Sequence, residues 1–517
     1  MKKKFPIGIQ SFEKIRTEGY HYIDKTSLVY QLVMTDSPYF LSRPRRFGKS
    51  LLLSTIEAFF LGKKELFKGL AIENLETEWK TYPVLHLDFN AETYDSINSL
   101  ERILNNYLCT WEAQYGKESS ETSYSLRFKG IIRRAHMKTG KKVVVLIDEY
   151  DKPLLQTIEN RELQTSHKIL LKAFYAVLKS VDADLRFVFL TGVTKFGQVS
   201  VFSDLNQLKD ISMDARYATI CGITKTELLD NFRSDLEELA HSEKMTYDEV
   251  CEKMRYMYDG YHFRHNMEGV YNPFSVLNAL DSQEFASYWF STGTPTFLVE
   301  LLKRTDYDLR DLEGVELAAD QFADYRADAE FPIPVIYQSG YLTIKGYDKR
   351  FGTYKLGFPN EEVKYGFLTF LNPYYTGIPK GKSNFNIEHF VKELEAGDVN
   401  AFLTRLRGFF AGIPYELNDK TERHYQVVFY LVFRLLGQYI DAEERSTKGR
   451  ADAVVKTKDH IFVFEFKLNG STEDALKQIN EKGYLIPYET DGRKLIKIGV
   501  SFDSDMRNIG DWKIENA

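Results

Sequence analysis

The sequence predicts an α/β protein in which a mainly parallel sheet with helices on both faces is followed by a helical middle region and a second α/β unit. Short apolar runs alternate with amphipathic segments over residues 37–193, which is the rhythm of strands joined by helical crossovers. New strand and helix patterns start at about residue 387. At 517 residues the chain is also long for one hydrophobic core, which favours two or three domains.

Composition indicates a folded chain without a membrane segment. The 43% hydrophobic and 14% aromatic content argue against disorder, and the longest apolar runs are far shorter than the roughly 20 residues of a membrane span. The apolar stretch near the start is too short for a secretory signal, so we expect a cytoplasmic protein. A net charge of -6 does not indicate nucleic-acid binding, so any DNA contact must rest on local patches.

The first unit is predicted over residues 1–220. Its strands are expected at "PYFL" (38–41), "PVLHLDF" (83–89), "KKVVVLIDE" (141–149) and "LRFVFLTGV" (185–193), with helices starting at Lys49 and spanning 162–180. Helical segments at 224–232, 247–263 and 273–280 define a middle region over 221–330. We expect its aromatic residues to pack the interior rather than to stack on bases; these are Tyr256, Tyr258, Tyr261 and Phe263. A connector with a few strands follows over 331–386, and the last unit covers 387–517.

The stretch "SRPRRFGKS" (42–50) contains the second half of the phosphate-loop pattern GxxxxGK(S/T). Gly48, Lys49 and Ser50 supply the turn, the phosphate-binding ammonium and the hydroxyl for Mg²⁺. Arg43 stands where the first glycine is usual, so the loop is a variant, and a purely structural helix start competes with the functional reading. Arg43, Arg45 and Arg46 are candidates to neutralise phosphates of ATP or DNA, with a solvated loop as the alternative.

The acidic partner of such a loop follows the strand "VVVLI". Asp148 is the candidate ligand of Mg²⁺, and Glu149 the candidate catalytic residue that orients the attacking water. Acids that merely cap the next helix are the alternative. Thr191 and Thr194 end the next strand, where a polar group would sense the γ-phosphate, unless they are turn residues. Order and context predict a P-loop NTPase domain.

The C-terminal stretch "ADAVVKTKDHIFVFEFKL" (451–468) predicts a hairpin with a chemical site. If Lys456 faces Ile461, the same register sets Asp452 opposite Glu465, with Cβ atoms roughly 5 Å apart, close enough to share a divalent metal. Strand alternation places Lys467 on the face of Glu465, while the phenylalanines between them point into the core. Two carboxylates and a lysine suit metal-dependent phosphodiester hydrolysis; a surface acid pair offset by a lysine is the alternative.

Two flanking helices carry further candidates. The helix after Ser471 carries Gln478, which could also be a plain exposed residue. The long helix upstream begins near Glu422, for which a capping box from Asp419 competes with a catalytic role.

The motifs "YIDKT" (22–26), "RPRRFGKS", "VLIDEYD", "TGVTKF", "YDGYHF" and "YNPFSVL" resemble the bacterial AAA-ATPase-like family, in which a C-terminal PD-(D/E)XK nuclease-like domain is common. The resemblance covers nearly the whole chain. It implies ATP binding with Arg46, Gly48, Lys49 and Ser50, and it places Asp24 and Lys25 near the nucleotide.

The C-terminal residues resemble the PD-(D/E)XK, restriction-endonuclease-like superfamily. The resemblance assigns Asp452 and Glu465 to metal, Lys467 to catalysis, Glu422 to the accessory acid, and Gln478 with Tyr484 to the next helix motif. Ala451 replaces the usual proline.

Together these patterns predict an ATP-hydrolysing protein whose first module regulates or loads a nuclease that cleaves DNA with Mg²⁺, or with Mn²⁺ in its place. A nucleotide-switched nucleic-acid-binding or scaffold protein without cleavage is the alternative. A DNA-translocating motor would require a homo-oligomer, which the sequence leaves open.

Overall fold

A computed structural model of the chain describes residues 4–35, 38–158, 160–194, 207–292, 298–299, 301–302, 305, 307–319, 321–322, 331–413, 422–437, 439, 441–444 and 451–516. The chain divides into two compact units, Met1–Thr305 with Glu313–Glu362, and Asp306–Leu312 with Val363–Ala517. The predicted four-part division at residues 220, 330 and 386 stays a prediction. Within the described residues, no helix has the length and apolar character needed to cross a lipid bilayer.

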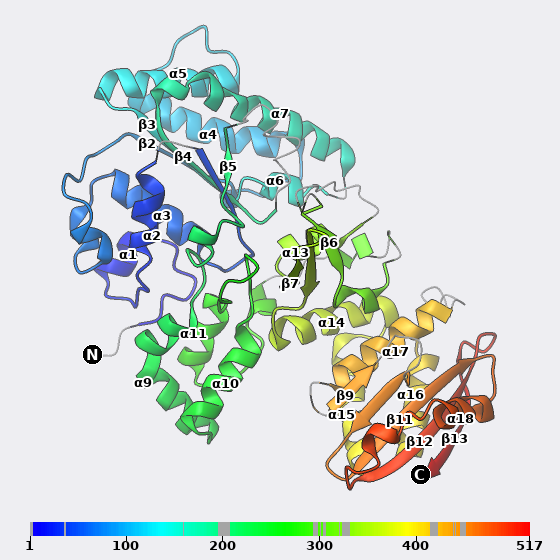
Figure 1. Cartoon of the computed structure of the whole chain (residues 1–517). Helices are drawn as coiled ribbons and strands as arrows, with labels where there is room; N and C mark the ends of the chain where they lie inside the picture. The colour runs from blue at the N-terminus through cyan, green and yellow to red at the C-terminus, as the bar shows by residue number, and fades with distance from the viewer. Residues whose placement is uncertain are drawn as a thin grey trace. The chain divides into compact units, whose positions relative to one another are not determined.

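The first unit is built on a five-stranded parallel sheet in the order β2-β3-β4-β1-β5. The strands are β1 (Pro38–Ser42), β2 (Val84–Asp88), β3 (Val143–Asp148), β4 (Leu185–Gly192) and β5 (Lys209–Asp210). In Figure 1, α1 (Phe12–Thr17), α2 (Thr26–Val33) and α3 (Lys49–Phe60) cover one side of the sheet, and α4 (Ile97–Tyr115), α5 (Tyr124–Thr139) and α7 (Arg161–Ser180) cover the other. This arrangement confirms the predicted parallel sheet with helices on both faces.

The strand order determines which residues meet. All six residues of β3 are buried, as expected for a strand covered on both faces. β4 lies between β1 and β3, and the carboxyl ends of parallel strands meet at one edge. The loop after β1, the acids at the end of β3 and Thr191 of β4 therefore converge at that edge.

The middle region of the first unit is helical, as predicted. Its helices are α9 (Lys225–Glu243), α10 (Tyr247–Tyr258) and α11 (Pro273–Ser282), and capping boxes at Thr224 and Thr246 open the first two. Of the four aromatic residues expected inside, Tyr258, Tyr261 and Phe263 are buried, but Tyr256 is 57% exposed. The expectation for Tyr256 was wrong because residues two apart on a helix lie on opposite faces.

A small antiparallel sheet completes the first unit. Its strands are β6 (Glu316–Ala318), β7 (Thr343–Asp348) and β8 (Thr353–Gly357), in the order β6-β8-β7, and the short helix α13 (Ile333–Gln338) precedes β7. Strands were expected in this stretch, although not their arrangement.

The second unit is a mixed sheet in the order β13-β12-β11-β10-β9. Its elements are α15 (Lys380–Glu395), α16 (Val399–Ala411), α17 (Glu422–Leu436), β9 (Asp441–Glu444), β10 (Ala453–Lys456), β11 (His460–Leu468), α18 (Thr472–Glu481), β12 (Lys494–Asp503) and β13 (Asn508–Asn516), and α14 (Glu361–Thr376) leads into it. β11 and β12 are parallel and are joined through α18; the other pairs are antiparallel.

The register of the C-terminal hairpin is the predicted one, since Lys456 pairs with Ile461 and Ala453 with Phe464. The alternation of faces is also confirmed. Phe464 packs against Phe402 of α16 and Phe433 of α17. The opposite face packs on α18 through a cluster of buried residues: Ala451, Val454, Ile461, Val463, Leu476, Ile479 and Tyr484.

Candidate functional sites

The turn between β1 and α3 has the backbone of an anion-binding loop. Gly48, the residue before α3, has φ 85°, and Arg46 has φ 68°, both in the left-handed region that favours glycine. Apart from Gly48 and its chain neighbours, no described atom lies within 4 Å of the place where a Cβ on Gly48 would stand. The first amide groups of α3 have no partner within the helix and carry its positive dipole, so this turn suits a phosphate.

Lys49 connects the turn to the end of β3. Its side chain is 4% exposed and donates to the carbonyl oxygens of Arg43 at 3.1 Å and Pro44 at 3.2 Å. The same ammonium lies 3.0 Å from Oε1 of Glu149. Glu149 has φ 52°, a costly backbone conformation for a residue with a side chain. The ammonium and the carboxylate therefore neutralise each other at the mouth of the loop.

Asp148 lies behind this pair and is buried. It accepts hydrogen bonds from the hydroxyl groups of Thr191, at 2.5 Å, and of Ser50. Burial raises the pKa of Asp148, and the charge of Glu149 acts in the same direction. The two residues expected to hold Mg²⁺, Ser50 and Asp148, are thus brought together. Thr191 reaches Asp148 and lines neither cavity described below.

Thr194 binds Asp151, and its expected role as a γ-phosphate sensor stays a prediction. Its hydroxyl and its amide donate to Oδ2 of Asp151, each at 2.6 Å, and Val193 N also donates to this carboxylate. Asp151 is fully buried, and burial raises its pKa to about 6. The sequence reading missed Asp151, although it lies three residues beyond Asp148 in the quoted "VLIDEYD".

Arg43 is an anchor of the loop and not a phosphate ligand, which corrects its expected role. It is 1% exposed and donates to the carbonyl oxygens of Ser212, at 2.8 Å, and Tyr217, at 3.0 Å. Its guanidinium lies 3.9 Å from the ring centroid of Phe263, and burial lowers its pKa. Trp289 fastens the loop from another side, since its indole Nε1 donates to Arg45 O at 3.2 Å.

A polar cavity of about 880 Å³ opens at this edge of the sheet. Arg45, Arg46, Lys49, Ser50 and Glu149 all line it. Lys152 and Asn90 also line it, with Lys152 Nζ donating to Asn90 O at 2.9 Å. The cavity therefore collects positive charge around the phosphate loop.

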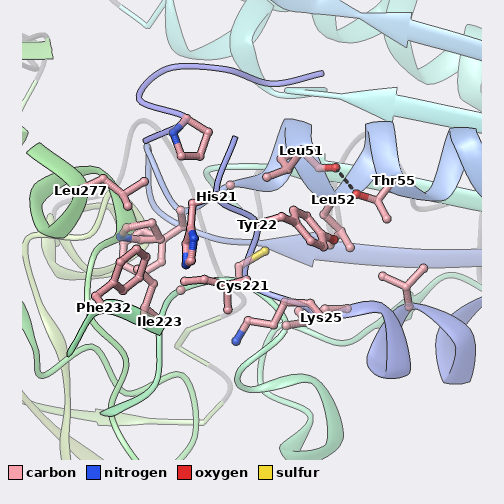
Figure 2. Close-up of a pocket in the computed structure, with 18 residues that line it drawn as sticks. His21, Tyr22, Lys25, Leu51, Leu52, Thr55, Cys221, Ile223, Phe232 and Leu277 are labelled. Carbon is pink, nitrogen blue, oxygen red and sulfur yellow. Dashed lines mark hydrogen bonds between the residues drawn. The ribbon is translucent and has the colours of Figure 1, made fainter. Parts of the chain in front are cut away.

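A smaller, apolar cavity of about 110 Å³ adjoins the loop, and Figure 2 shows His21, Cys221, Phe232 and Leu277 around it. Lys25 also lines it, and its ammonium lies 2.6 Å from Oε1 of Glu227 on α9.

Asp24 lines neither cavity. Its Oδ1 accepts from Thr26 N and Oγ1, and its Oδ2 from Ala71 N at 2.7 Å. Both carboxylate oxygens of Asp24 therefore hold the start of α2 against a neighbouring turn, and its expected place near the nucleotide stays a prediction.

In the second unit, Glu465 is the centre of a compact polar cluster. It is 2% exposed, and its Oε1 accepts from Lys467 Nζ at 3.0 Å and from Gln478 Nε2. Its Oε2 is buried and has no hydrogen-bond partner in the described parts of the chain. Burial, followed by the charge of Asp452, raises the pKa of Glu465 to about 7. An unsatisfied buried carboxylate oxygen beside a second carboxylate suits a divalent cation.

Gln478 ties the cluster together. Its Oε1 accepts from Lys467 Nζ at 2.6 Å, and its Nε2 donates to the hydroxyl of Tyr484 at 3.2 Å. Asp452 stands just before β10, and its Oδ2 accepts from Phe466 N at 2.8 Å. Five candidates of this unit therefore meet on the face of the sheet that packs on α18: Asp452, Glu465, Lys467, Gln478 and Tyr484.

Glu422 is the first residue of α17, but its side chain and the proposed cap at Asp419 lie outside the described residues. Among the residues that are described, no three His, Cys, Asp or Glu side chains form a ready-made metal group.

Gly499 explains how α18 approaches this cluster. It pairs with Glu465 in the sheet, and a Cβ at this position would lie 2.5 Å from Thr472 O. The missing side chain lets α18 lie directly on the strand, which brings Gln478 to Glu465.

Comparison with known proteins agrees with this geometry. A family model described as "Predicted AAA-ATPase" matches residues 6–202, and one described as "PD-(D/E)XK nuclease superfamily" matches residues 420–512. A protein of Azotobacter chroococcum mcd 1, described as "Uncharacterized protein in vnfD 5'region", is 37% identical over 100% of this chain and 99% of its own length.

Among solved structures, the Aeropyrum pernix ORC2 protein in its ADPNP and ADP complexes covers 65% of this chain and 88% of its own, at 11% identity and a TM-score of 0.25, which is too low to bear on the fold. The two family models, in the expected order, carry the assignment. The chain belongs to the family of AAA-ATPase-like proteins that bear a C-terminal PD-(D/E)XK nuclease-superfamily domain.

Proposed function

We propose that the protein binds and hydrolyses ATP at the edge of the first sheet, and that this nucleotide cycle controls a Mg²⁺-dependent nuclease in the second unit that cleaves DNA. One observation carries the nucleotide half. The polar and the apolar cavity share Gly48 and Leu51 from the phosphate loop and helix, and Pro273 and Leu277 from α11. A polar, cationic chamber joined to an apolar one fits a triphosphate joined to a base.

The chemistry of the first site follows from the contacts of Lys49. A phosphate bound at Gly48 competes with Glu149 for this ammonium, and Glu149 is then free to orient water. Ser50 and Asp148 would hold Mg²⁺, which when bound neutralises charge on the phosphates. Thr191 fixes the rotamer of Asp148 through its 2.5 Å hydrogen bond.

In the second site, Asp452 and Glu465 would hold the divalent cation, Mg²⁺ or Mn²⁺, which when bound lowers the pKa of water and stabilises charge on the phosphate. Lys467 lies within 3.0 Å of Glu465 and is positioned to orient or deprotonate the attacking water. Gln478 holds both side chains in place.

The test of this function is cleavage of linear and circular DNA by the purified chain with Mg²⁺ or Mn²⁺, with and without ATP. Cutting that depends on ATP supports both halves. Cutting that ignores ATP contradicts the coupling. ATP binding without any cutting would replace the nuclease by a nucleotide-switched binding protein.

The raised pKa of Glu465 makes cation binding depend on pH. With a pKa of about 7, this carboxyl is mostly protonated at pH 6 and mostly ionised at pH 8. The apparent affinity for Mn²⁺ should therefore rise about tenfold between these pH values. Titration calorimetry at both pH values measures it, and an affinity independent of pH would contradict a role of Glu465 as ligand.

The same shift predicts the pH dependence of folding without metal. Because the folded-state pKa lies above the usual value of 4.5, folding favours the protonated form. Its contribution to stability is present at low pH and is lost as the pH rises toward 7. The melting temperature of the native chain should therefore fall between about pH 5 and pH 7 by an amount that is absent in Glu465→Gln, and thermal unfolding at both pH values measures the difference.

The two loop arginines should separate stability from nucleotide binding. Arg43→Met removes buried charge-assisted hydrogen bonds and should cost about 2 to 3 kcal/mol of unfolding free energy. Arg45→Met changes an exposed residue and should cost less than about 0.5 kcal/mol while weakening ATP binding. Denaturant unfolding and ATP titration distinguish them; equal stability of both variants would contradict the anchoring role of Arg43.

A further inference from the structure

The β7–β8 hairpin of the first unit ends in a turn over residues 348–353 that its own hydrogen bonds hold. Tyr347 pairs with Tyr354 and Asp348 with Thr353. Oδ1 of Asp348 accepts the amides of Arg350, at 2.8 Å, and Phe351, at 3.3 Å. Gly352 closes the turn with φ 69°. The only acid of the turn is therefore used inside it, and the turn is held in one conformation.

The turn exposes an aromatic ring between cations. Phe351 is 67% exposed, and the guanidinium of Arg350 lies 5.0 Å from its ring centroid. Lys349 and Arg350 are exposed and form no ion pair in the described parts of the chain. The turn therefore presents an apolar ring and these two cations together at the surface.

A stack of rings supports the turn from behind. His265 stacks on Tyr347 at 4.2 Å between ring centroids, and Tyr347 lies 4.6 Å from Tyr354. After burial, the charges of Arg264 and Lys349 are the causes that lower the pKa of His265, and no carboxylate is among them. We call these residues the ribbon-tip patch: Arg264, His265, Tyr347, Lys349, Arg350 and Phe351.

We propose that the ribbon-tip patch is a contact for duplex DNA that lies outside the nuclease unit. Cations of the turn bind the phosphates that flank a groove of B-DNA, and an exposed apolar ring beside them packs on sugars or wedges at a base step. The inference deepens the proposed function, since it names a second contact for the DNA that the nuclease unit would cut. The inference rests on the proposed nuclease function only for the choice of DNA as the partner.

The test measures binding of a short labelled DNA duplex by the full chain carrying Glu465→Gln, so that cutting does not interfere. In that background, Lys349→Ala with Arg350→Ala should weaken binding about tenfold and lower the salt dependence by about two counterions. Phe351→Ala should weaken binding with little change in salt dependence. The matched control is Lys168→Ala with Lys179→Ala, two exposed lysines of α7 with the same loss of charge.

Equal DNA binding by the tip and control variants would overturn the inference. It would also be overturned if the tip variants lost binding to RNA or to a protein partner but still bound DNA. The proposed nuclease is tested separately, by cleavage with native Glu465. If that chain does not cut, the tip variants can still show weaker DNA binding, so the two proposals can fail independently. Circular dichroism of each variant excludes unfolding as the cause.

Discussion

Glu465→Gln abolishes DNA cleavage, with an expected loss of about a thousandfold or more. The substitution keeps the size of the side chain and an oxygen that accepts from Lys467, but removes the negative charge that a cation requires. Glu465 is 2% exposed, so its carboxylate lies inside the cluster with Lys467 and Gln478. Initial rates on a supercoiled plasmid, at saturating Mg²⁺ and Mn²⁺, measure the loss.

The matched control is Glu473→Gln on α18. The side chain of Glu473 is 66% exposed and pairs with Lys513 at the surface. This variant should cut at the native rate. If both variants cut alike, Glu465 is not a metal ligand and the nuclease proposal fails at its central residue.

Lys49→Ala raises the Kd for ATP by about a hundredfold, which corresponds to about 2.7 kcal/mol. The ammonium contacts both the loop carbonyls and Glu149, so its loss removes a phosphate ligand and leaves that carboxylate to repel the triphosphate. Titration with ATP in the presence of Mg²⁺ measures the change in affinity. Cleavage, if controlled by nucleotide, should no longer respond to ATP.

Lys63→Ala is the comparison for this variant, because Lys63 also pairs with a glutamate, Glu13, but at the surface. It should bind ATP normally. An unchanged Kd in Lys49→Ala would show that nucleotide binds elsewhere, whereas unfolding of the variant would appear as a lower melting temperature before any titration.

The hairpin and the main sheet were predictable because their signals are local. Continuous apolar runs identified the buried strands, and a single assumed pair, Lys456 with Ile461, set the register that joins Asp452 to Glu465. The alternation of β11 then placed Lys467. Each of these steps needs only the geometry of a strand.

The anchors of the phosphate loop could not be predicted because they come from distant parts of the chain. Arg43 meets the carbonyl groups of Ser212 and Tyr217 and the ring of Phe263, about 170 to 220 residues further on. A cluster of arginines carries no local sign of which member is buried. Asp151 was missed for a similar reason, since the amides that it binds, of Val193 and Thr194, follow β4, about 40 residues further along the chain.

The burial of Arg43 has a consequence for how the ATP site can be isolated. A conventional glycine loop carries its shape in its own backbone, whereas this loop takes its shape from Ser212, Tyr217 and Phe263, and from Trp289 on Arg45. All four lie beyond residue 202, where the matching ATPase family model ends. A fragment cut at that limit would keep the loop, Asp148 and Glu149, but it would lose these supports and the part of the apolar cavity that Cys221, Pro273 and Leu277 line. The smallest expressible ATP-binding piece therefore extends well into the helical region that follows.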